Sequence, residues 1–242
     1  MPLPMENSWR HVFKLDPDRT IGEQELEAVC TSGSDAIIIG GSSGVTYENT
    51  EALLERIRRF KIDCALEVSE LDAIVPGFDL YLIPMVLNTQ RPEWLIGHHA
   101  RAIEKYGPFI PWDRLLPEGY IVLNPEATVA RITEADTSLD AAAAAGYAGA
   151  ADKLMQLPII YVEYSGRFGD MELVGEVRRQ LAQARLFYGG GITNAETARQ
   201  ATTVSDTVVV GNVIYSDLAG ALATVEAVKG ARSSSVGTNT NG

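Results

Sequence analysis

Two glycine-rich stretches lie near the C-terminal end of the chain, and each follows a strand-like apolar run. The first, "LFYGGGIT" (186–193), contains three consecutive glycines, and the second, "DTVVVGNVIY" (206–215), contains a Gly-Asn pair. Glycine lacks the Cβ atom that would keep an anion away from backbone N–H groups, and a following helix N-terminus adds partial positive charge. The glycines could instead only form tight turns. Because both stretches end strands, we interpret them as a phosphate-binding cradle made of Gly190, Gly191, Gly211 and Asn212.

Charged and hydroxyl side chains follow two earlier strand-like runs. Lys14 and Asp16 close "HVFKLD", and Ser42 and Ser43 follow "IIIGG". A lysine can neutralise phosphate oxygens, and Mg²⁺ is commonly held by one or two carboxylates together with substrate phosphates. A surface ion pair for the first two residues and helix capping for the serines are the simpler alternatives. We expect Lys14 to contact phosphate and Asp16 to bind Mg²⁺, and a serine hydroxyl could join the metal ligands.

A single carboxylate stands inside another apolar run, "IIYVEYSG" (159–166). Burying a carboxylate is unfavourable unless it has a partner or a role. Strand alternation places Tyr161, Glu163 and Ser165 on one face and the residues between them on the other. A partly desolvated carboxylate can act as a general base, and a structural ion pair is the alternative. We interpret Glu163 as the catalytic base, and we find no convincing second acid in the sequence.

The elements that would position these residues alternate regularly. Eight short apolar runs are typical of strands that are covered on both faces. They span residues 11–15, 35–41, 64–68, 80–87, 120–124, 159–165, 186–191 and 207–212. Helical patterns occur between them at 21–33, 46–60, 91–107, 138–157, 170–183, 194–203 and 216–229. For a chain of 242 residues this alternation predicts an α/β fold, a (β/α)₈ barrel of the TIM type.

One connection is too short for a helix. Only residues 69–79 separate the third and fourth runs, and they include Pro76 and Gly77. A parallel crossover normally needs a dozen or more residues. We therefore predict eight strands but seven full outer helices, with an extended segment in place of the third helix and a groove on the barrel wall.

Composition limits the classes of function. The net charge of −12 argues against a nucleic-acid partner, which requires a basic surface. The two cysteines have no metal-type spacing, and we find no signal peptide and no apolar run of membrane-spanning length, so we expect a cytoplasmic protein with reduced thiols. The three histidines form no metal-binding pattern. We expect one domain over residues 1–230 and a polar, disordered tail over 231–242.

Several phrases resemble the PcrB proteins of the geranylgeranylglyceryl phosphate synthase family. They are "FKLDP", "IIIGGSSGVT", "EVSELDAIVPGFDLYLIPMVLN", "YVEYSGRFGD", "LFYGGGI" and "DTVVVGNVIY". The resemblance extends from about Trp9 to Lys229. It implies a TIM-barrel prenyltransferase whose third helix is replaced by an extended segment. It also implies a homodimer that uses Mg²⁺, sn-glycerol 1-phosphate and a long polyprenyl diphosphate, heptaprenyl in the bacterial members.

The resemblance also implies roles for particular residues. Asp16 and Ser42 would hold Mg²⁺, and Glu163 would accept the proton of the glycerol hydroxyl. Ala102 would occupy a position beside the prenyl groove where a bulky residue limits tail length in archaeal relatives. The glycerol phosphate would contact Lys14, Tyr161, Val162, Glu163, Tyr164, Ser165, Gly166, Gly191, Gly211 and Asn212.

Two other functions fit parts of the pattern. A phosphosugar isomerase or aldolase would use the same phosphate cradle but needs no long apolar groove. A non-catalytic lipid-phosphate carrier would use the cradle and the groove but not Glu163. The acidic surface argues against stable electrostatic membrane anchoring, so we expect at most transient membrane contact.

Overall fold

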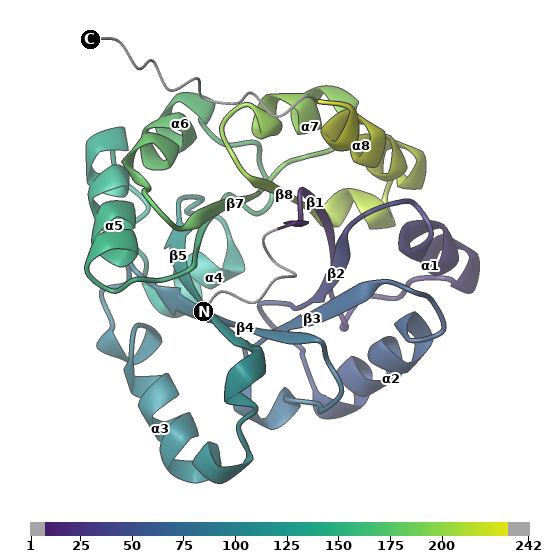
Figure 1. Ribbon diagram of the computed structural model, residues 1–242, viewed down its shortest axis with the longest axis horizontal. Coiled ribbons are helices and arrows are strands. Elements are labelled where there is room, and N and C mark those ends of the chain that lie inside the picture. Colours follow the sequence, from purple (N-terminus) through teal and green to yellow (C-terminus); the bar gives the residue numbers. More distant parts are fainter. Residues whose placement is uncertain (1–7, 232–242) are drawn as a thin grey trace, which may run out of the picture.

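Eight parallel strands form a closed barrel in the computed structural model, which describes residues 8–231 (Figure 1). Each strand pairs with the next, and the last pairs with the first. The strands are β1 (His11–Leu15), β2 (Ala36–Ile39), β3 (Asp63–Glu67), β4 (Leu80–Val86), β5 (Leu115–Val122), β6 (Ile159–Glu163), β7 (Arg185–Gly189) and β8 (Thr207–Val210). The predicted (β/α)₈ barrel is confirmed. Most of the expected tail, from residue 232 onward, lies outside the described residues.

Helices surround the barrel (Figure 1). The α-helices are α1 (Glu23–Cys30), α2 (Tyr47–Ile57), α3 (Gly97–Tyr106), α4 (Thr128–Thr133), α5 (Ala141–Lys153), α6 (Met171–Gln180), α7 (Ala195–Thr202) and α8 (Leu218–Gly230). Single 3₁₀ turns are η2 (Leu71–Ala73), η3 (Pro92–Trp94), η4 (Gly107–Phe109), η5 (Trp112–Arg114) and η6 (Asn212–Tyr215). The short α4 was not expected, and it precedes α5 in the connection between β5 and β6.

The connection between β3 and β4 contains no α-helix, as the sequence predicted. It holds only the single turn η2 and otherwise extended chain. Val75 and Phe78 anchor this segment in the core, and the Tyr81 hydroxyl donates a hydrogen bond to the Val75 carbonyl at 3.0 Å. Figure 1 shows α2 and α3 on either side of β3 and β4. The wall of the barrel therefore lacks a covering helix at this point.

Alternation along the strands creates two apolar layers. Residues such as Val12, Ala65 and Tyr161 belong to the cluster inside the barrel. Their strand neighbours, such as Phe13 and Leu66, pack in the outer layer between strands and helices. Because successive side chains point to opposite faces, this pattern also places the polar strand residues Lys14, Glu67, Glu118 and Glu163 on the inner face.

The fifth strand begins earlier than expected. Its pairing with β4 starts at Leu115, whereas the apolar run that indicated a strand starts at Tyr120. The intervening residues include Pro117 and Gly119, which are usually depleted in strands. Closure of the barrel requires β5 to pair on both sides, so tertiary structure overrides these local preferences.

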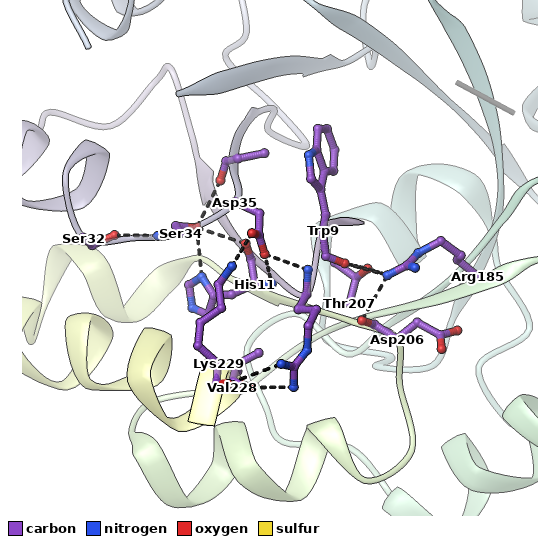
Figure 2. Close-up of polar contacts among 12 residues, drawn as sticks. Trp9, His11, Ser32, Ser34, Asp35, Arg185, Asp206, Thr207, Val228 and Lys229 are labelled. Atoms are coloured by element: carbon purple, nitrogen blue, oxygen red, sulfur yellow. Dashed lines mark hydrogen bonds and ion pairs between the residues drawn. The ribbon is translucent and has the colours of Figure 1, made fainter. Parts of the chain in front are cut away.

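Polar contacts close the barrel at the N-terminal ends of the strands (Figure 2). One carboxylate oxygen of Asp35 accepts hydrogen bonds from the backbone N–H groups of Arg10 and His11 at 2.8 and 3.0 Å, and the other pairs with Lys229. The Arg10 guanidinium donates to the carbonyl of Val228 at 2.7 Å. These contacts join the first strand to the last helix, at the end of a barrel that typically serves stability.

Candidate active site

A large cavity opens at the C-terminal ends of the strands. Its volume is about 1480 Å³. Most residues singled out in the sequence line it: Lys14, Asp16, Ser42, Ala102, Tyr161, Glu163, Ser165, Gly166, Gly190, Gly191, Gly211 and Asn212. The side chains of Val162 and Tyr164 instead lie in the outer layer, so only their backbone could contact a molecule in the cavity. The fold thus brings residues from both ends of the sequence around one space.

Glu163 lies inside the barrel at the end of β6 and is 5% exposed. One carboxylate oxygen accepts a hydrogen bond from the Tyr120 hydroxyl at 2.9 Å, and the other accepts one from the Ser165 backbone N–H. Burial raises the pKa of Glu163, while the positive charge of Lys14 acts in the opposite direction. A carboxylate that is oriented from two sides and has a raised pKa is suited to general base catalysis.

Lys14 is bound within the barrel rather than free at its mouth. Its ammonium group forms an ion pair with Glu67 at 2.5 Å and lies 3.4 Å from the Tyr120 hydroxyl. The ammonium also lies 5.6 Å from the centre of the Tyr161 ring, which stacks on Tyr120. Burial alone would lower the pKa of Lys14, but the charges of Glu67 and Glu163 raise it overall. Lys14 is therefore a fixed cation close to Glu163.

Sequence reasoning missed two further carboxylates inside the barrel. Glu67 is 6% exposed at the end of β3, and Glu118 is fully buried in β5. Neither carboxylate oxygen of Glu118 has a hydrogen-bond partner among the described residues. Burial, followed by the charge of Glu67, raises the pKa of Glu118 well above its usual range, which favours the neutral form of this acid. The runs "CALEV" and "PEGYIV" contained the same signal that identified Glu163, a carboxylate on the inner face of a strand.

The glycines after β7 permit close contact between two loops. Gly190 and Gly191 have φ angles of +148° and +57°, in the region that favours glycine. A Cβ atom on Gly190 would overlap Tyr164, and one on Gly191 would overlap the backbone at Phe168. The loop after β6 therefore packs directly on this turn. The sequence predicted that an anion approaches the backbone of these glycines; in the structure, the protein's own loop after β6 lies against Gly190 and Gly191.

The second half of the cradle follows β8. Gly211 has a negative φ, and the short turn η6 begins at Asn212. In TIM barrels, the loops after the seventh and eighth strands and the N-terminus of a short extra helix frequently form a phosphate site. Gly191, Gly211 and Asn212 line the same cavity as Glu163. This arrangement is suited to hold a phosphate group within reach of the buried carboxylate.

An arginine near the cradle was not expected from the sequence. The Arg19 guanidinium stacks on the Tyr215 ring at 3.8 Å and donates to the Asn212 side-chain oxygen at 3.1 Å. The Tyr215 hydroxyl in turn accepts a hydrogen bond from the Asp16 backbone N–H at 2.8 Å. These contacts connect the loop after β1 to the loop after β8. They place a cation beside the predicted phosphate and metal ligands.

The donor set at Asp16 fits Mg²⁺ only if phosphate oxygens complete it. No group of three or more His, Cys, Asp or Glu residues within residues 8–231 could hold a metal by itself. Asp16 and Ser42 both line the cavity, and a Cβ atom on Gly41 would lie 2.7 Å from an Asp16 carboxylate oxygen. The bare backbone at Gly41 thus leaves space around that oxygen. One carboxylate with a hydroxyl matches the preference of Mg²⁺ for few protein ligands and several phosphates.

An apolar groove extends the cavity away from the barrel axis. The outward-facing residues Tyr81, Ile83 and Met85 of β4 lie along it, and Ala102 of α3 lines its side. The extended third connection contributes residues such as Ile74 and Pro76. The turns η4 and η5 after α3 contribute Phe109 and Trp112 to the lining, and these side chains are 84% and 57% exposed. The groove thus runs from the buried carboxylate, through the gap left by the missing helix, to the surface.

Comparisons with known proteins indicate a family. The PcrB family profile matches residues 6–229. The heptaprenylglyceryl phosphate synthase of Brevibacillus brevis is 54% identical over 222 residues, covering 92% of this chain and 96% of that protein. The protein of the same name from Bacillus cereus is 53% identical over 224 residues, covering 93% and 98%.

Solved structures agree with the fold. The (S)-3-O-geranylgeranylglyceryl phosphate synthase of Thermoplasma acidophilum, in complex with sn-glycerol-1-phosphate, matches with a TM-score of 0.82 at 23% identity, covering 94% of this chain and 96% of that chain. The enzyme of Thermoplasma volcanium matches with a TM-score of 0.81 at 24% identity, covering 93% and 94%. At this identity the likeness concerns the arrangement of the chain.

Proposed function

The chain belongs to the PcrB family, and we propose on this basis that it transfers a heptaprenyl group to sn-glycerol 1-phosphate in a reaction that depends on Mg²⁺. Prenyl transfer to a glycerol phosphate is the activity that the relatives' names support directly. One structural observation carries the proposal: a single cavity joins the glycine cradle, the carboxylate of Glu163 and a long apolar groove. These are the three parts that a phosphate-bearing acceptor and an apolar donor require.

The cradle would hold the acceptor. Backbone N–H groups around Gly191, Gly211 and Asn212 would bind the phosphate and leave the C3 hydroxyl of the glycerol near Glu163. Glu163 would accept the proton of this hydroxyl as the oxygen forms its new bond. Tyr120 and the Ser165 N–H hold the carboxylate in position for the transfer. Fixing both reactants supplies much of the rate enhancement.

The donor reacts at its first carbon. The bond between this allylic carbon and the diphosphate oxygen breaks, the diphosphate takes the bonding electron pair, and the glycerol oxygen forms an ether bond to the carbon. Asp16 and Ser42 would hold Mg²⁺, which supplies positive charge to the departing diphosphate. Arg19 lies beside this region and would add to that charge.

The size and lining of the cavity favour this reaction over the chemistry of a phosphosugar isomerase. Pockets for small molecules usually measure about 300–1,000 Å³, and this cavity measures about 1480 Å³. Glu67 and Glu118 do add acids that the sequence had not indicated. However, Glu67 is paired with Lys14, and Glu118 is fully buried in β5.

The proposal includes the assembly and surroundings of the protein. Membership of the family supports a homodimer in the cytoplasm, and sedimentation at micromolar concentration would detect the dimer. No helix within residues 8–231 is long and apolar enough to cross a membrane. With a net charge of −12, contact with an anionic bilayer would be transient at most.

The decisive experiment offers the protein a series of donors. Radiolabelled sn-glycerol 1-phosphate is incubated with Mg²⁺ and prenyl diphosphates of increasing length, and the products are extracted into an organic solvent. We expect label in the organic phase, with a maximum at the heptaprenyl donor and a loss of transfer when Mg²⁺ is chelated. Absence of transfer with every donor would refute the proposal.

Substitution of the proposed base, Glu163, distinguishes the enzyme hypothesis from the lipid-phosphate carrier hypothesis. Glu163→Gln keeps the size of the side chain but removes its basicity. We expect transfer to fall about 10²–10⁴-fold, because this is the usual contribution of a general base. Binding of sn-glycerol 1-phosphate, measured by calorimetry, should change little. Unchanged transfer in this variant would remove Glu163 from the mechanism.

A further inference from the structure

Lys14 is the cation whose charge acts on Glu163, but it does not pair with Glu163. Both groups contact the Tyr120 hydroxyl, which is 3.4 Å from the Lys14 ammonium and donates to Glu163 at 2.9 Å. The ammonium instead forms its ion pair with Glu67 at 2.5 Å. The remaining oxygen of Glu67 is buried and has no hydrogen-bond partner in the described part of the chain. Within the described residues, the carboxylate of Glu67 therefore forms its hydrogen bond and ion pair with Lys14 alone.

We propose that Glu67 is a positioning residue that retains Lys14 and thereby keeps Glu163 available as the base. The inference rests on the proposed function, because it concerns the carboxylate that accepts the hydroxyl proton. Glu67 lines the cavity, but its carboxylate is paired with Lys14. It acts through Lys14, whose charge would otherwise be directed at Glu163.

Elementary electrostatics gives the reason. An ammonium inside a protein seeks a carboxylate, because an unpaired buried charge is strongly unfavourable. Without Glu67, the candidates are Glu163 and Glu118, and burial, the largest cause of the raised pKa of Glu118, still disfavours its charged form. A cation beside a carboxylate typically lowers its pKa by about 1–3 units. Glu163 would then be a weaker base with one oxygen occupied.

Every group that faces Glu163 enters this balance. Titratable and charged groups act on it from β1, β3, β5, β6 and β7. They are Lys14, Glu67, Glu118, Tyr120, Tyr161 and Tyr188. The three tyrosines have raised pKa values, chiefly because of burial, and stay neutral. Among the described residues that act on Glu163, Lys14 and Glu67 therefore bring opposite charges that balance each other near the base.

The pH dependence of kcat/KM for sn-glycerol 1-phosphate tests the proposal. A general base must be deprotonated, so the rate rises with pH through the pKa of Glu163. In Glu67→Gln we expect this acidic limb to move to lower pH by about one unit, because the charge of Lys14 is no longer neutralised. The plateau should fall about tenfold or more, because the base is weaker. The phosphate of the substrate titrates near pH 6 in every variant, so only differences between variants are compared.

Three variants serve as controls. Glu67→Asp keeps the charge and should restore much of the wild-type profile. Glu118→Gln removes an acid whose burial favours the neutral form and should leave the limb in place. The double variant Lys14→Met/Glu67→Gln removes the pair as a unit, and its acidic limb should return close to that of the wild type although its rate is lower.

The outcomes separate this inference from the proposed function. Wild-type protein that transfers no prenyl group refutes the proposed function itself. Wild-type activity with an unchanged acidic limb in Glu67→Gln shows a merely structural role and overturns the inference. If Glu67→Gln does not fold, the double variant decides: a limb displaced by more than half a pH unit from the wild type contradicts the inference, and a coincident limb supports it.

Discussion

His11 is buried at the end of the barrel opposite the candidate active site, and both ring nitrogens are engaged. They lie 2.9 Å from the hydroxyl oxygens of Ser34 and Thr224. Burial lowers the pKa of His11 to about 3, against the opposing charge of Asp35. The ring is therefore neutral in the folded protein at every pH at which the enzyme would work.

We predict that His11 makes the protein less stable as the pH falls. The unfolded chain binds a proton at His11 below about pH 6.5, whereas the folded chain does not until about pH 3. Stability is thus complete above pH 6.5 and is lost progressively below it. Between pH 7 and pH 5 the free energy of unfolding should fall by about 2 kcal/mol from this residue. Urea titrations at both values, with His11→Gln as the reference, measure it. An equal decrease in both proteins would contradict the prediction.

A second prediction about a single residue concerns Gly191. Its φ of +57° and the overlap of a Cβ atom with the backbone at Phe168 make Gly191→Ala unfavourable by about 1–3 kcal/mol. Gly211→Ala is the matched control, because its φ is negative and the nearest atom is the Lys14 carbonyl oxygen at 3.4 Å. Thermal denaturation should show a lower Tm for the first variant only. Equal shifts in Tm would refute the steric argument.

Sequence reasoning about single residues succeeded where a side chain stood out from its run. Glu163 was found because it interrupts apolar residues, and alternation correctly predicted which neighbours share its face. Glu67 lies in a similar run but was not among the residues predicted to form the site. Its ion pair with Lys14 joins β1 to β3 and depends on barrel closure. The sequence alone could not pair the two.

Among the elements, α3 has the most direct influence on the groove. Ala102 lines the cavity from this helix, and His99 fixes the helix to β4 through a contact of 3.1 Å with the Pro84 carbonyl. A larger side chain at position 102 would therefore extend into the cavity.

We predict that Ala102→Trp shortens the preferred prenyl donor. The indole would occupy groove volume that a long tail needs, so the optimum should move by at least one isoprene unit. Competition among donors of different length, with analysis of the extracted products, measures the shift. Ala102→Ser is the control of similar size and should keep the wild-type profile. An unchanged profile in Ala102→Trp would remove Ala102 from length selection.

Element boundaries show what the sequence can and cannot specify. The absence of a third helix followed from a count of residues, because eleven residues that include Pro76 and Gly77 are shorter than the dozen or more that a parallel crossover normally needs. The start of β5 and the short α4 were not predicted. The first contains Pro117 and Gly119, and the second has no side-chain cap at Ala127 and ends at Glu134 in a left-handed conformation. Tertiary contacts rather than local preferences determine both.

At the scale of the whole molecule, Asp35 connects distant parts of the chain. It bridges the backbone before and at the start of β1 to Lys229 in α8 (Figure 2). The Lys229 bond and the backbone N–H groups lower the pKa of Asp35, although burial opposes them. The charged carboxylate therefore contributes to closure of the barrel.

We predict that Asp35→Asn lowers the stability of the entire fold. The NH₂ group of the asparagine is itself a donor, and it would face one of the donors that Asp35 now accepts from, the Arg10 and His11 N–H groups or Lys229. Hydrogen bonds to a charged group such as the Asp35 carboxylate contribute about 1.5–3 kcal/mol. The Tm should fall by about 2–4 °C per kcal/mol for a domain of this size. Lys229→Met removes only the ion pair and should cost about 0–1 kcal/mol. A larger effect of Lys229→Met than of Asp35→Asn would contradict this account.

Because of the extended segment between β3 and β4, the length of a substrate is not limited by the width of the barrel. An eight-stranded barrel has an interior just wide enough for side chains, so most barrels of this kind act on small metabolites at the mouth. Here the cavity leaves sideways between the extended segment and α3. A donor could therefore gain length outside the strands without any change in the catalytic residues. Members of the family could change tail length through surface residues alone while the reaction itself stays constant.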